Sequence, residues 1–73
     1  MNYYIVYNSK FMTSRKTLKS AIKAVKKRGY TNSGFNYCYI QDEHGNLWTT
    51  DGEVIDDYDE WLNNSYNEWL KSI

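Results

Sequence analysis

The segment SRKTLKSAIKAVKKRG, residues 14–29, predicts the first helix and with it the layout of the fold. Its apolar residues recur with the i, i+3, i+4, i+7 spacing of one helix face, namely Leu18, Ala21, Ile22 and Val25. Ser14, or alternatively Thr13, is the expected N-cap, and Gly29 is the expected C-terminal stop. The lysines gather on the opposite side. The segment therefore predicts an amphipathic helix over 14–28 with a basic outer face.

The segments around this helix predict strands and a second helix. Aromatic and β-branched residues favour strands at 2–8, 35–41 and 47–50 and a shorter one at 53–55, with a turn at 9–13 and a loop at 30–34. Asp57 and Glu60 resemble a capping box that opens a last helix. The apolar stripe of that helix is Tyr58, Trp61, Leu62, Tyr66, Trp69, Leu70 and Ile73.

The element order β-α-β-β-(β)-α defines the expected fold class. It predicts an α+β protein, a small two-layer sandwich with two helices on one face of a mainly antiparallel, three- to four-stranded sheet. The 73 residues are expected to form a single domain, 1–73. The one cysteine, Cys38, cannot form an intramolecular disulfide, so we expect a reducing cytoplasm, that of the host if the chain is phage-encoded. No signal peptide, membrane span or membrane partner is expected.

Charge is divided between the two halves of a formally neutral chain. Eight of the nine basic residues lie within 1–40, and all nine acidic residues lie within 41–73. Such asymmetry is typical of a surface that binds a charged partner. Two other interpretations stay open at this point. The two helices could lie side by side and screen each other, or the complementary halves could drive self-association.

The basic helix contains a candidate anion or nucleic-acid site. Arg15 and Lys16 fall in the expected first turn, where a cation opposes the helix dipole and a bound anion would explain it. The candidate residues are Ser14, Arg15, Lys16, Lys19, Lys23 and Lys27. The alternative is a solvated outer face. If nucleic acid binds, tyrosines on the open face of the sheet are expected to stack on bases.

The acidic half contains a candidate protein interface. Its residues are Trp48, Asp51, Glu53, Asp56, Asp57, Asp59 and Glu60. Carboxylates at this density can engage a basic surface on another protein. The alternative is a solubilising surface whose acids complement the dipole at the start of the last helix.

Catalysis, metal binding and cofactor binding are not predicted. His44 falls in a turn beside two carboxylates, and Cys38 falls in a strand without a neighbouring base. The short length and the richness in Asn, Tyr and Lys resemble small accessory and inhibitor proteins of phages. We therefore expect a non-catalytic interaction module that binds a host or rival protein. The alternative function is a nucleic-acid-binding domain that uses the basic helix 14–28 and exposed tyrosines.

Overall fold

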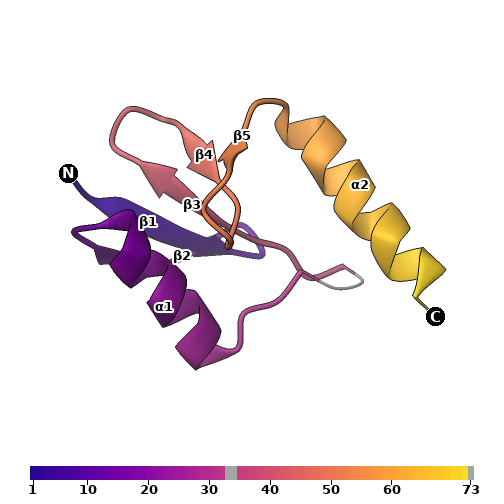
Figure 1. The fold of residues 1–73 in the computed structure, drawn as a ribbon, viewed down its shortest axis with the longest axis horizontal. Helices are drawn as coiled ribbons and strands as arrows, with labels where there is room; N and C mark the ends of the chain where they lie inside the picture. Colours follow the sequence, from indigo (N-terminus) through magenta and orange to yellow (C-terminus); the bar gives the residue numbers. More distant parts are fainter. Residues whose placement is uncertain (33–34, 73) are drawn as a thin grey trace.

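The chain folds into a five-stranded antiparallel sheet with two helices (Figure 1). The computed structural model describes residues 1–32 and 35–72. In chain order the elements are β1 (Tyr3–Tyr7), β2 (Lys10–Arg15), α1 (Leu18–Arg28), β3 (Cys38–Asp42), β4 (Leu47–Trp48), β5 (Val54–Ile55) and α2 (Tyr58–Lys71). The α+β class is confirmed, with five strands in place of three or four. Parts of two sequence predictions, positions 33–34 of the loop and Ile73 of the last helix, lie outside the described residues.

The additional strand is β2, which forms the edge of the sheet order β2-β1-β3-β4-β5. Asn8 and Ser9 have φ angles of 51° and 67°, and two consecutive positive φ values are the geometry of a tight type I′ hairpin turn. The turn folds β2 back along β1. Residues 9–13 are therefore mostly strand, and the prediction that Ser14 caps the first helix is wrong, because Ser14 lies within β2.

Helix α1 begins three residues later than predicted. Thr17 is its N-cap, and the Thr17 hydroxyl accepts a hydrogen bond from the backbone N–H of Ser20 at 3.1 Å. Gly29 adopts a φ of 72° and ends the helix, which confirms its predicted role, because this left-handed conformation suits glycine.

The hydrophobic core lies between α1 and one face of the sheet. Its buried members are Ile5, Ala21, Ala24, Val25, Cys38 and Ile40. Leu18 and Ile22, which belong to the same predicted stripe, are partly buried and pack against this cluster. The apolar face of α1 is therefore used in the core, and its lysines point outward.

Helix α2 contacts the opposite face of the sheet. The rings of Tyr58 and Trp61 meet the Tyr39 ring edge-on, with centroid distances of 5.5 and 6.1 Å. Tyr39 alternates along β3 with the buried Cys38 and Ile40, so its side chain lies away from α1. The helices were expected on one face, but the contacts of Tyr39 place α2 on the face opposite α1, and the two helices lie well apart (Figure 1). The apolar stripe of α1 covers the face that carries Ile5 and Ile40, and the aromatic stripe of α2 contacts the face that carries Tyr39.

Candidate functional site

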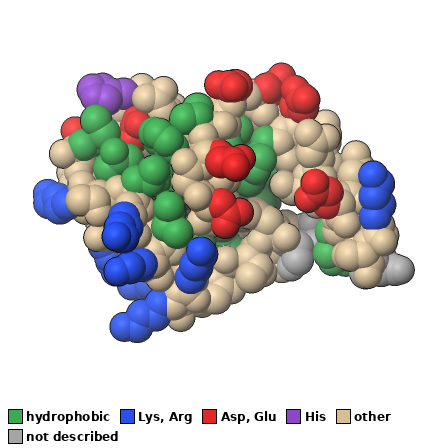
Figure 2. Space-filling model, in the orientation of Figure 1, with side chains coloured by type: hydrophobic (Ala, Val, Ile, Leu, Met, Phe, Trp, Pro, Cys, Tyr) green, Lys and Arg blue, Asp and Glu red, His purple; other side chains and the backbone are tan. Residues whose placement is uncertain are grey.

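The two charged halves of the chain stay apart in the folded molecule. Figure 2 shows most basic side chains gathered over α1 and most acidic ones toward the end that carries β5 and α2. Within the described residues, no Lys or Arg side chain forms an ion pair with an Asp or Glu side chain. The two helices therefore do not screen each other's charge, which was one of the interpretations that the sequence left open.

Acidic side chains line two adjoining hollows beside α2. The larger has a volume of about 460 Å³ and lies between α2 and the segment 49–53. The smaller has a volume of about 280 Å³ and lies beside β5 and the first turns of α2. Both are lined by Thr49, Glu53 and Trp61, so they form one continuous groove. The carboxylates of this acidic groove are Asp51, Glu53, Asp56, Asp57, Glu60 and Glu68.

A hydrogen-bonded turn holds one wall of the acidic groove. The Thr49 hydroxyl accepts hydrogen bonds from the backbone N–H groups of Asp51 and Glu53 at 3.3 and 3.1 Å. Gly52 has a φ of 94°, which favours glycine, and a Cβ there would lie 3.2 Å from the Ile22 side chain. The turn therefore rests against α1, and these contacts fix the backbone that carries Asp51 and Glu53.

The opposite wall is the aromatic side of α2. Asp57 is the N-cap of this helix and accepts a hydrogen bond from the backbone N–H of Glu60 at 3.1 Å, as predicted. Trp61 and Trp69 both line the groove and are partly exposed. Burial, together with the neighbouring Tyr37 and its hydrogen bond, raises the pKa of Tyr58 to about 12. Tyr58 does not itself line the groove, and the charge of the groove comes from its carboxylates.

Most of the predicted acidic interface residues converge on this groove. Asp51, Glu53, Asp56, Asp57 and Glu60 all line it, whereas Asp59 and Trp48 do not. The sequence prediction did not include Glu68, Trp61 and Trp69. Their helical spacing placed them on α2, but only the fold shows that this part of the helix faces the turn at 49–53.

Trp48 is held away from the groove by the buried Asp42. The Asp42 carboxylate accepts hydrogen bonds from the Trp48 indole N–H at 3.2 Å and from the backbone N–H groups of His44 and Asn46 at 2.9 and 3.0 Å. Burial raises the pKa of Asp42, but these hydrogen bonds and one from the Asn46 side chain lower it by more than burial raises it. The net shift of the pKa is therefore downward. Asp42 thus fixes the β3–β4 turn, and its charge is satisfied inside the protein.

The candidate basic residues are distributed over β2, α1 and the short link between them. Lys16, Lys19, Lys23 and Lys27 are exposed. Arg15 ends β2, and its guanidinium donates hydrogen bonds of 2.8 Å to the Thr13 hydroxyl and the Ser14 carbonyl. Arg15 and Lys16 are therefore not in the first turn of α1. The dipole argument for an anion at that position was wrong, because it rested on the wrong helix start.

The tyrosines expected to stack on bases are only partly available. Tyr39 is covered by two rings of α2. Tyr4 lies on the same face of the sheet and contacts Phe11 at a centroid distance of 5.7 Å, with Phe11 62% exposed. This open aromatic pair lies on the face opposite α1, so it does not extend the lysine surface of that helix.

Two other kinds of feature are not found within residues 1–32 and 35–72. No helix in residues 1–32 or 35–72 has the length and apolar character needed to cross a bilayer. In the same residues, no cluster of three or more His, Cys, Asp or Glu side chains is placed to hold a metal ion. Comparison with protein families, with curated proteins and with solved structures finds no match for this chain.

Proposed function

We propose that this chain is a non-catalytic protein-interaction module that binds a basic surface of a partner protein in the acidic groove. The observation that carries the proposal is the convergence of carboxylates along one groove without an ion pair to any described Lys or Arg. Carboxylates gathered in this way repel one another, and a cationic partner relieves that repulsion. Complementary charge also accelerates the encounter with such a partner and selects against acidic competitors.

The walls of the groove favour a polypeptide with Arg or Lys side chains. Trp61 and Trp69 offer aromatic surface on which the aliphatic stem of a long cationic side chain can lie. The larger hollow has about the volume of a typical ligand pocket. Nucleic acid does not suit this groove, because its phosphates would face the carboxylates.

A short capped peptide of alternating arginine and serine tests the groove, with binding followed by quenching of tryptophan fluorescence. We expect saturable binding that weakens with salt, and a clear loss of affinity when Glu53→Gln and Glu68→Gln are combined. The matched control is Asp59→Asn combined with Glu43→Gln, which removes the same charge outside the groove. Equal loss in both double variants would refute the proposal, because it would show attraction to net charge alone.

The chemistry of the groove is compatible with a role that occupies or blocks a partner. Composition supports this role, since the chain resembles small accessory and inhibitor proteins of phages, and the site of action would then be the host cytoplasm. A pull-down from the native host tests it. We expect one defined protein to be retained by the wild type and by the Asp59/Glu43 control, and lost with the Glu53/Glu68 variant. Retention of nucleic acid alone would contradict it.

A second candidate function is nucleic-acid binding by α1. One observation favours it: the lysines of this helix are exposed, and no described acidic side chain pairs with them. Binding would then depend on phosphate contacts and fall steeply with salt. We expect Lys19→Glu combined with Lys23→Glu to abolish gel retardation of mixed DNA or RNA. Absence of retardation by the wild type at ~50 mM salt would rule this function out.

A further inference from the structure

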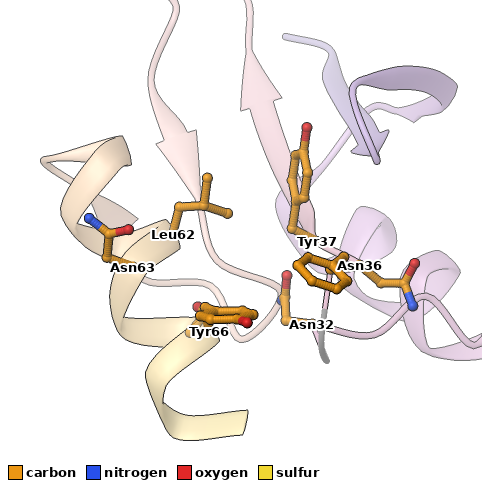
Figure 3. A pocket seen from close by; sticks show the side chains of 8 residues that line it. Asn32, Asn36, Tyr37, Leu62, Asn63 and Tyr66 are labelled. Atoms are coloured by element: carbon orange, nitrogen blue, oxygen red, sulfur yellow. The ribbon is translucent and has the colours of Figure 1, made fainter. Parts of the chain in front are cut away.

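A second hollow lies beside α2, and it is apolar. It has a volume of about 310 Å³ and is lined by Phe35, Tyr37, Leu62 and Tyr66, with Asn32, Asn36, Asn63 and Ser65 also in its lining. Figure 3 shows Leu62 and Tyr66 projecting from α2 toward Tyr37 and Asn32. We call this hollow the apolar pocket. It is an open surface of the fold, distinct in chemistry from the acidic groove.

The apolar pocket leaves large apolar groups in water. Phe35 touches Tyr66 at a centroid distance of 5.6 Å but remains 84% exposed. None of the residues 58–71 of α2 is buried. Exposed apolar surface of this kind is typical of a contact site for another macromolecule. The pocket therefore needs an occupant that carries an apolar side chain.

The neighbouring charge defines that occupant further. Asn32 and Ser65 line both the apolar pocket and the larger hollow of the acidic groove. A segment that fills the pocket thus lies next to carboxylates, and charge complementarity requires it to carry a cation close to its apolar side chain. The occupant is an exposed stretch of chain that is both apolar and basic.

The chain itself presents such a stretch at the edge of its sheet. Lys10, Phe11 and Met12 begin β2, which pairs with β1 on one side only. All three are exposed, Phe11 to 62% and Met12 to 39%. The basic helix α1 does not meet the requirement, because its apolar residues Ala21, Ala24 and Val25 are buried in the core. Leu70 and Lys71 are also exposed and adjacent, but they belong to α2, the helix that lines the pocket. Among the described residues away from that helix, β2 is the exposed segment that combines an apolar with a basic side chain.

We propose that a second copy of this chain occupies the apolar pocket through the segment Lys10–Met12. Phe11 of one copy enters the pocket beside Leu62 and Tyr66 of the other, and Lys10 lies against the adjoining carboxylates. The two surfaces of the contact are different, so each copy carries one of each kind. If two copies exchange these contacts reciprocally, the assembly closes as a dimer, and otherwise it grows head to tail.

Sedimentation of the full chain over a range of concentrations tests the contact. We expect the weight-average mass to rise above the 8.7 kDa of the single chain and to fall again with added salt. Phe11→Ser should weaken the association about ten- to hundredfold, because burying a phenyl side chain contributes about 1.5–3 kcal/mol. Lys10→Gln should weaken it roughly two- to fivefold. Lys23→Gln, with the same change of charge on α1, should leave it unchanged.

Variants of the pocket complete the test. Leu62→Ser should abolish association, and Leu70→Ser, which removes a leucine of α2 that does not line the pocket, should not. Because Leu62 is partly buried, Asn63→Arg serves as a second variant at an exposed position and places a cation against Lys10. A mixture of Phe11→Ser and Leu62→Ser chains should associate again, since each retains the surface that the other lacks.

Two results would overturn the proposal. One is a mass of 8.7 kDa at every concentration, which would leave the pocket to a different occupant. The other is association of Leu62→Ser and Asn63→Arg chains as strong as that of the wild type, which would show that the contact lies elsewhere. Neither result bears on the peptide titration of the acidic groove, so the two proposals fail separately.

Discussion

Replacement of Trp61 by alanine should loosen α2 without unfolding the rest of the protein. Trp61 is partly buried, and its ring contacts Tyr39 of β3, which links the helix to the sheet, as well as Tyr58 of the same helix. Replacing a fully buried Phe or Trp by Ala costs about 3–5 kcal/mol, so a partly buried ring is worth roughly half of that, about 2 kcal/mol. A loss of this size increases the open population of α2 about thirtyfold.

Native-state hydrogen exchange by NMR measures this population residue by residue. In Trp61→Ala we expect the amides of α2 to exchange about thirtyfold faster, while the amides of Ile5 and Ile40 at the centre of the sheet change much less. Trp69→Ala is the control, because the ring contact found for Trp69 is with Tyr66 of the same helix. If the α2 amides and the Ile40 amide lose protection by the same factor, α2 opens only with the whole domain and the reasoning is refuted.

Three other predictions test the local interactions of the fold. Thr17→Ala should lower the free energy of unfolding by about 1 kcal/mol, because it removes the helix cap, whereas Ser14→Ala should have a small effect; urea denaturation of both variants decides between the two positions. The folded-state pKa of Asp42 is depressed, so its stabilising contribution is present above the ordinary pKa of an aspartate and is lost as the pH falls through the folded value. The urea midpoint of the wild type should therefore drop in acid, and that of Asp42→Asn should drop less. An acid dependence that is the same in both proteins would contradict this. Burial raises the pKa of Cys38 to about 11, so a thiol reagent should leave the native protein unlabelled at mildly alkaline pH and label it fully in guanidinium chloride; rapid native labelling would show that the core opens easily.

Helical spacing made α1 and α2 predictable, but the start of α1 was missed for a physical reason. A serine followed by basic residues at 14–16 suits a helix start as well as an edge strand, so local propensity did not decide between them. The deciding feature is the hairpin turn at Asn8 and Ser9, whose positive φ angles are stabilised by tertiary contacts. The Asn8 side chain accepts a hydrogen bond from the backbone N–H of Tyr37 at 2.9 Å, a partner 29 residues away that no local pattern shows.

The sequence predicts most of the charged residues of the candidate site, but it does not predict the groove that they line. The carboxylates from Asp51 to Glu60 are close in sequence, so their proximity follows from the tight turn and the helix start alone. Trp69 and Glu68 lie beside these carboxylates only because α2 packs on the face of the sheet that carries Tyr39. This arrangement follows from the alternation of Tyr39 with Cys38 and Ile40, since α1 covers the face that carries Cys38 and Ile40.

Charge is separated across the fold, without an ion pair between the described Lys or Arg and Asp or Glu side chains, so the molecule has a dipole moment but a formal net charge of zero. In a uniform electric field such a molecule experiences a torque but no net force, so the field orients it without attracting it. Near a charged surface of another macromolecule, within about a Debye length of ~8 Å at physiological ionic strength, the same particle arrives with one pole already in front. The fold thus supplies a preferred orientation of approach, and this orientation is set before any side chain of the partner is touched.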